Sequence, residues 1–222
     1  MSWGEIGCIN SNMKKTLNEQ LREQSFTILK VITETGTYTP EKTGLYRVIC
    51  VGAGGNGVNN TSTSTYLSIG GGGGGVAIKD MVLSSTTSYN VTVSTFAQFG
   101  TGLIANGGTT GAYSGSTVTT EPEGGTASGG DYNFQGAKGW TRSKTNLPAR
   151  GGSVQCVIPG LNKDIFAADA MHNKLRYGNS ILGYGGGGPA VIGYLDGTYN
   201  RDYYLPGLPA AVIIIPLELE GY

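Results

Sequence analysis

The run of six glycines from Gly70 to Gly75 is the feature that most constrains how this chain can fold. Glycine opposes helix formation by about 1 kcal/mol relative to alanine, and the residues just before the run are rich in Ser and Thr. More glycines follow, so that 39 of the 222 residues are glycine, about 18% against a usual ~7%. The glycines lack the three-residue period of collagen. We therefore expect a mainly β protein with long extended segments.

The glycine runs have a second interpretation besides loops. Extended polyglycine chains can form a lattice of polyproline-II helices, bonded N–H to C=O between neighbours, because the missing Cβ lets backbones approach closely. The runs that would stack in this way are Gly70–Gly75, Gly107–Gly108, Gly124–Gly125, Gly129–Gly130, Gly151–Gly152 and Gly185–Gly188. In such a lattice, the loops between the runs would project at one end.

Strand patterns surround the glycine runs. Residues 26–33, 44–51 and 76–83 are rich in Val and Ile, and residues 86–96 alternate apolar and polar side chains with period two. The first two are expected to pair, and all four to make half of a β-sandwich. The run 211–215 predicts a buried closing strand, which Pro216 either ends or places at an edge. Residues 162–178 predict a short helical piece with Gly178 as its C-cap.

The first 25 residues differ from the rest. Apolar residues recur there at steps of four among good helix formers, with a Ser or Asn as N-cap. These residues are Ile9, Met13, Leu17 and Leu21. Because the apolar stripe is narrow, the helix needs a partner surface, either the body of the protein or copies of itself. The predicted organisation is an attachment or oligomerisation segment over 1–25, followed by a glycine-rich β domain over 26–222. That domain is β-sandwich-like or contains polyglycine II.

Charge and cysteine content exclude several classes of protein. Fifteen basic and fifteen acidic residues cancel, which gives no support to a nucleic-acid partner. No apolar run is long enough for membrane insertion, and the N-terminus lacks the pattern of a signal peptide. We expect synthesis in the cytoplasm. Cys8, Cys50 and Cys156 form neither an even disulfide framework nor a metal pair, so we expect reduced thiols.

Gly52-x-Gly54-x-x-Gly57 follows a strand pattern and matches the spacing of dinucleotide-binding turns. Such a turn must open a helix whose N-terminus faces the pyrophosphate. Residues 58–75 oppose a helix at nearly every position, so a dinucleotide-binding enzyme is kept only as a remote alternative. No catalytic set, no metal-ligand spacing and no cofactor motif is predicted elsewhere, since a lone His172 cannot supply them.

Two groups of motifs resemble parts of phage tails. The matching pieces of the domain are residues 35–39, 48–57, 70–77, 183–190 and 211–216. Their order resembles the glycine-rich domains of bacteriophage tail-fibre and adhesin proteins, over roughly residues 26 to 217. Separately, the start MSWGEIGCINSNMKKTLNEQL is similar to N-terminal segments of tail or baseplate proteins from phages and phage-derived particles of Gram-positive bacteria.

The resemblance implies a virion or tail-particle component that is tail-fibre-like or baseplate-associated. It implies that the N-terminal segment binds other tail or baseplate proteins and that the chain forms a homo-oligomer, with a trimer favoured. Adhesins of this family recognise surface sugars or proteins through loops between polyglycine strands, which implies a cell-surface glycan or protein receptor. The alternative within the class is a structural collar or decoration protein without receptor binding.

Candidate receptor-binding residues are chosen as aromatic and planar polar side chains, which suit sugar recognition. Two segments supply them. They are Asp131, Tyr132, Asn133, Phe134, Trp140 and Arg142 in the first, and Tyr199, Arg201, Asp202, Tyr203 and Tyr204 in the second. The competing interpretation is that these aromatic residues pack the irregular core of a glycine-rich body.

Overall fold

A computed structural model describes the part of the chain on which the fold is built. The described residues are 30–60, 67–115, 117–143, 149, 151–154, 166–167, 171–172, 175–176, 180–181, 184–188, 190–192 and 202–219. Every helix or strand within these ranges is a β-strand, so the fold is mainly β, as predicted. The predicted N-terminal helix with Ile9, Met13, Leu17 and Leu21 lies outside the described residues.

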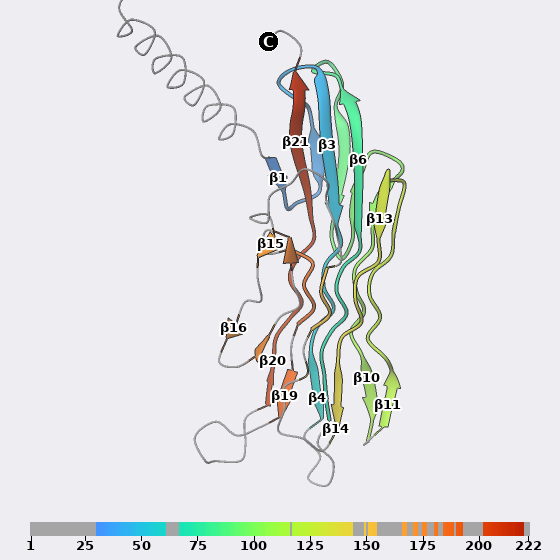
Figure 1. The fold of residues 1–222 in the computed structure, drawn as a ribbon, viewed down its shortest axis with the longest axis vertical. Helices are drawn as coiled ribbons and strands as arrows, with labels where there is room; N and C mark the ends of the chain where they lie inside the picture. The colour runs from blue at the N-terminus through green and yellow to red at the C-terminus, as the bar shows by residue number, and fades with distance from the viewer. Residues whose placement is uncertain are drawn as a thin grey trace, which may run out of the picture.

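Two five-stranded antiparallel sheets occupy one end of the molecule (Figure 1). In order across the sheet, sheet A contains β1 (Lys30–Ile32), β21 (Ala211–Leu219), β3 (Gly44–Val51), β6 (Val76–Leu83) and β13 (Tyr132–Phe134). Sheet B contains β12 (Ala127–Ser128), β9 (Leu103–Ala105), β8 (Ala97–Phe99), β7 (Tyr89–Val93) and β2 (Gly36–Tyr38). We call these two sheets the head.

A buried apolar cluster joins the two sheets. Tyr46, Val48 and Cys50 alternate along β3 and meet Val91 and Phe99 of sheet B in this cluster. The alternate residues of β3 point to the opposite face of sheet A, as the period of two requires. There Ile49 and Val51 belong to a second buried cluster. Sheet A is therefore apolar on both faces, which explains why β3 and β6 are nearly continuous apolar runs.

The strands β3 and β6 confirm the predicted bounds 44–51 and 76–83, and β7 lies within the predicted 86–96. The predicted pairing of 26–33 with 44–51 is wrong, because β21 lies between β1 and β3. The connection between them contains β2, which pairs with β7 in sheet B. The closing strand also continues beyond Pro216, through a bulge that shifts its register between Pro216 and Glu218.

Below the head, the chain runs through eight extended segments that lie side by side (Figure 1). We call them the glycine bundle, and they comprise residues 52–57, 70–75, 106–111, 122–126, 135–140, 151–154, 185–188 and 205–210. Five of the six predicted glycine runs lie in the bundle. The prediction for Gly129–Gly130 is wrong, since these two residues form the turn between β12 and β13, and Gly129 has a φ of 80°.

Residues 70–75 form the centre of the bundle, and their N–H groups donate to three neighbouring segments in a repeat of three. Gly70 and Gly73 donate to the segment 135–140, at Trp140 O and Ala137 O (both 2.8 Å). Gly71 and Gly74 donate to the segment 185–188, at Gly188 O (2.8 Å) and Gly185 O (2.7 Å). Gly72 and Gly75 donate to the segment 106–111, at Thr109 O (3.0 Å) and Asn106 O (2.9 Å). Three other segments donate back to the centre, from Gly52, Gly125 and Gly152. The central segment thus has six hydrogen-bonded neighbours.

Those six neighbours form a closed ring in the order of the sequence. Each is bonded to the next by backbone hydrogen bonds: Gly108 to Ala53, Thr109 to Glu123, Gly136 to Gly125, Ala137 to Ser153, Gly187 to Gly152 and, closing the ring, Gly188 to Gly55, at 2.8 to 2.9 Å. The last segment, 205–210, lies outside the ring, where Leu208 N donates to Gly186 O and Leu205 O accepts from Gly57 N.

Glycine content falls from the centre of the bundle outward. All six central residues are glycine, and a Cβ added at Gly71, Gly72 or Gly74 would overlap a carbonyl oxygen of a neighbouring segment. Segments of the ring mix glycine with other residues, and several of the latter are exposed, such as Thr109, Thr126 and Lys138. The outer segment 205–210 contains one glycine, Gly207. A side chain is tolerated wherever the backbone has no neighbour.

The remaining strands are short. Those beyond the lower end of the bundle are β4 (Val58–Asn60), β5 (Leu67–Ile69), β14 (Thr141–Ser143), β10 (Ala112–Ser114), β11 (Thr117–Thr120), β19 (Ala190–Ile192) and β20 (Asp202–Tyr204). Two further pairs are β15 (Phe166–Ala167) with β18 (Ser180–Ile181) and β16 (Met171–His172) with β17 (Leu175–Arg176). The described residues within 162–178 are therefore strands, and the predicted helix is wrong there.

The thiol of Cys50 gives a pH-dependent prediction. Burial raises its pKa to about 12, so the folded protein keeps this proton at pH values where the unfolded chain has lost it. The free energy of unfolding should therefore fall as the pH rises through about 8.5, the ordinary thiol pKa, by up to ~2 kcal/mol at pH 10. Urea titrations at pH 7.5 and pH 10 should show a smaller loss for Cys50→Ala than for the wild type; equal losses would contradict the prediction.

Candidate functional site

The end of the bundle opposite the head carries a group of short strands that we call the tip. Its largest element is the three-stranded sheet β14-β5-β4, and beside it lie the hairpin β10–β11 and the pair β19–β20 (Figure 1). The chain reaches this end repeatedly and turns back each time, because successive bundle segments run in opposite directions. The strand β1 lies in the head beside residues 212–214 of β21, and β21 ends at the far end of the head.

Exposed aromatic side chains gather at the tip. Tyr113 on β10 is 38% exposed, Trp140 at the start of β14 is 53% exposed, and Tyr204 on β20 is 61% exposed. One of these side chains is held by the neighbouring structure: the Tyr113 hydroxyl donates to the backbone oxygen of Asn59 (2.7 Å). The backbone of Trp140 is held as well, because its carbonyl accepts from Gly70 N (2.8 Å). Fixed aromatic faces lose little entropy on binding a ligand, which suits recognition.

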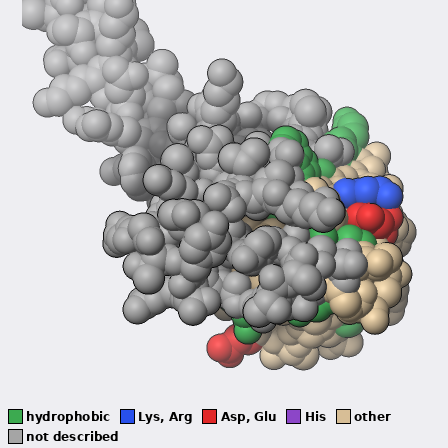
Figure 2. All heavy atoms as spheres, turned by 90° about the horizontal axis from the view of Figure 1, so that it is seen from below, with side chains coloured by type: hydrophobic (Ala, Val, Ile, Leu, Met, Phe, Trp, Pro, Cys, Tyr) green, Lys and Arg blue, Asp and Glu red, His purple; other side chains and the backbone are tan. Residues whose placement is uncertain are grey.

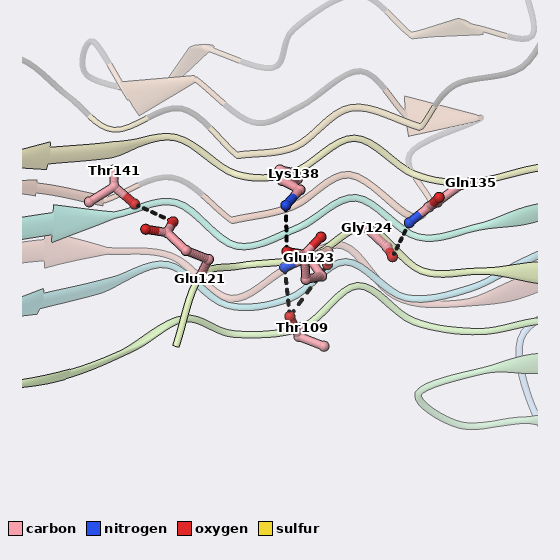
Figure 3. Close-up of polar contacts among 7 residues, drawn as sticks. All are labelled: Thr109, Glu121, Glu123, Gly124, Gln135, Lys138 and Thr141. Carbon is pink, nitrogen blue, oxygen red and sulfur yellow. Dashed lines mark hydrogen bonds and ion pairs between the residues drawn. The ribbon is translucent and has the colours of Figure 1, made fainter. Parts of the chain in front are cut away.

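Polar side chains link neighbouring segments of the ring along the length of the bundle, from Gln135 near the head to Thr141 at the tip (Figure 3). Thr109 and Glu123 bond through backbone and hydroxyl groups, with Glu123 N donating to Thr109 Oγ1 (2.8 Å). The carboxylate of Glu123 also binds the Lys138 ammonium and raises its pKa. Two further contacts are Thr141 Oγ1 to Glu121 Oε2 (3.3 Å) and Gln135 Nε2 to Gly124 O (3.5 Å). These contacts hold three neighbouring segments of the ring together.

Charge is sparse on the described surface seen from the tip end (Figure 2). Most of it is uncharged, and the basic side chain visible there lies against acidic ones. Such a surface offers no strong electrostatic attraction for a polyanion. Among the described residues, no group of His, Cys, Asp and Glu could hold a metal ion, and no helix is long and apolar enough to cross a membrane.

The first group of predicted site residues is divided between the two ends of the bundle. Asp131, Tyr132, Asn133 and Phe134 lie in or beside β13 at the edge of sheet A, whereas Trp140 and Arg142 lie at the tip. The six residues 135–140 separate them by about 19 Å, at ~3.1 Å per residue of an extended chain. These residues therefore do not form one binding surface.

The head residues of this group have structural contacts. Asp131 Oδ2 accepts from Asp80 N (3.0 Å), and the Asn133 amide exchanges hydrogen bonds with both backbone groups of Gly130. Phe134 packs on the second apolar cluster. Tyr132 remains 46% exposed. Near it, the Arg47 guanidinium binds both oxygens of Asp80 at 2.7 Å, and this hydrogen bonding raises the pKa of Arg47.

The second predicted group is partly described. Asp202, Tyr203 and Tyr204 form β20, which pairs with β19 at the tip. Tyr199 and Arg201 lie outside the described residues. Tyr113 was not predicted, although the pattern Ala-Tyr-Ser before Gly115, whose φ is 58°, marks a hairpin with an aromatic residue beside its turn.

The glycines of Gly52-x-Gly54-x-x-Gly57 face other parts of the chain. A Cβ at Gly52 or Gly54 would overlap the carbonyl oxygen of Asn106 or Gly186, so protein backbone fills the place of a pyrophosphate. The motif is followed by the strand β4 rather than by the helix that a dinucleotide site needs.

No protein-family model matches the chain, and neither does any curated protein. The geometry of the head, the bundle and the tip, together with the sequence resemblance, therefore gives the indication of the class of protein.

Proposed function

We propose that the chain is a structural component of a phage tail or phage-tail-like particle, tail-fibre-like or baseplate-associated, that takes part in recognising the host cell surface. The observation that carries this proposal is the separation of two ends. The described chain begins and finishes at the head, while three tip elements with exposed aromatic residues lie beyond the other end of the bundle. The head suits attachment to the particle, and the tip suits exposure to the cell surface.

We infer that the glycine bundle is a polyglycine-II lattice and that the head is β-sandwich-like. The three-residue repeat of hydrogen bonds from Gly70–Gly75 supports the lattice, since polyproline-II helices have three residues per turn. The apolar cluster shared by sheets A and B supports the sandwich. Such a bundle would be a stiff spacer, because each central residue is bonded to a neighbouring segment.

The proposed partners follow from the two ends. Residues 1–25 would bind other tail or baseplate proteins, and within the particle the chain would be a homo-oligomer, with a trimer favoured by the resemblance. The tip would bind a cell-surface glycan or protein. A collar or decoration protein without a receptor would have no use for exposed aromatic side chains, so the tip favours recognition over that alternative.

Immunogold electron microscopy of particles purified from the bacterium that encodes the chain tests this role. We expect antibodies against the tip strands to label intact particles at the distal end of the tail. Labelling elsewhere on the particle would support the collar alternative. Particles that lack the chain by mass spectrometry would refute the proposal.

A further inference from the structure

Apolar side chains are exposed at the upper end of sheet A, where β21, β3 and β6 lie side by side (Figure 1). Val82 on β6 is 69% exposed and pairs with Leu45 on β3. Leu217 is 42% exposed and is the extra residue of the bulge that opposes Leu45. We call Leu45, Val82 and Leu217 the end patch.

Three charged residues border the end patch: Arg47 and Asp80 in the row below it, and Glu218, which pairs with Leu45 on β3. Arg47 and Asp80 neutralise each other as a bidentate pair at 2.7 Å. In the next row, Ile49 and Ile78 are completely or almost completely buried. A single exposed Val would need no explanation, but Val82 and Leu217 flank Leu45 on both sides, and neighbouring exposed apolar side chains of this kind mark a contact site.

The course of the chain indicates which element covers the end patch. The strand β1 is antiparallel to β21, with Lys30 opposite Ile214, so the residues before Lys30 arrive beside Ile215 and the patch. Leu45 lies three residues along β3 from Val48, the partner of Ile214, which is about 10 Å. The nine residues from Leu21 to Lys30 can span up to ~30 Å, so the predicted helix reaches the patch easily.

We infer that the end patch is the docking surface for the N-terminal segment of the same chain, with the stripe of Ile9, Met13, Leu17 and Leu21 packed against it. A helix of this length is marginal in water unless its apolar face is covered. Docking also covers the exposed Val82 and Leu217. The segment that attaches the chain would thus leave the head in a defined direction.

Limited proteolysis of the full chain tests the docking, because trypsin can cleave after Lys14, Lys15 and Arg22 within the segment. We expect slow cleavage there in the wild type. Val82→Glu should accelerate it at least ~10-fold, since cleavage follows the population of the undocked state. Met13→Glu should do the same from the other side of the contact. The matched control is Asn90→Glu, which places the same charge on an exposed position of sheet B and should leave the rate unchanged.

Two results would overturn the inference. One is rapid cleavage of the wild type, or equal rates for the wild type and Val82→Glu. The other is protection from trypsin that disappears when the protein is diluted, together with a mass above the 23.0 kDa of one chain in light scattering. This result would assign the end patch to a contact with a second copy of the chain. The docking concerns the isolated chain, so its test does not depend on a role in a particle. Because Val82 is mostly exposed, the glutamate variant should fold, and circular dichroism checks this.

Discussion

Gly72→Ala is expected to lower the free energy of unfolding by more than about 4 kcal/mol, which approaches the whole stability of many domains. The added Cβ would overlap the carbonyl oxygen of Glu123. Gly72 also donates to Thr109 O and accepts from Gly55 N, so its backbone is held from two other sides. With six neighbours around it, the central segment cannot move to relieve the overlap. Urea denaturation followed by circular dichroism measures the loss.

The control for this prediction is Gly102→Ala. A Cβ at Gly102 would meet nothing within 4 Å, and its φ lies outside the left-handed region. We expect this change to be neutral, or to stabilise by up to about 1 kcal/mol through the unfolded state. If Gly72→Ala were as stable as Gly102→Ala, the close packing of the bundle would be disproved.

Much of the head could be predicted from local patterns. The strands 44–51 and 76–83 are confirmed at both ends, because buried strands in the middle of a sheet are continuous apolar runs bounded by turn residues. Their neighbours were predicted less well. The strand β21 inserts between β1 and β3 from a distance of more than a hundred residues, and no local signal specifies such a partner.

The arrangement of the bundle also could not be predicted from the sequence. Glycine runs indicate that backbones approach closely, but they do not say which backbones. The ring closes only because Gly188 bonds to Gly55, residues that are far apart in the chain. The decline from six glycines at the centre to one in the segment 205–210 becomes interpretable once these neighbours are known.

The candidate site shows a third kind of limit. The stretch from Asp131 to Arg142 looks like one cluster of aromatic and polar residues, and in a compact loop it would be one. An extended glycine segment between Phe134 and Trp140 instead carries the chain from the head to the tip. Only Trp140 and Arg142, which lie beyond that segment, are at the tip together with Tyr113 and Tyr204.

The separation of the head residues from the tip residues gives the second large prediction, which rests on the proposed role in recognition. Trp140→Ala and Tyr204→Ala should each weaken binding of the purified chain to host cells at least ~10-fold, because central aromatic anchors dominate the energy of an interface. Tyr132→Ala is the matched control: Tyr132 is 46% exposed, close to the 53% of Trp140, but it lies on the head. Removal of the Tyr132 side chain should leave binding to host cells unchanged. Flow cytometry with the fluorescently labelled chain measures all three variants.

The free energy of unfolding has to be measured on the same samples, so that a loss of binding can be distinguished from a loss of folded protein. Truncating an exposed side chain usually changes the free energy of unfolding by no more than about 0.5 kcal/mol, and all three variants should meet this limit. Binding that falls for Tyr132→Ala and not for the tip variants would move recognition to the edge of sheet A. Binding unchanged in all three would exclude these exposed aromatic side chains as receptor contacts, leaving the glycine bundle as a spacer for some other surface.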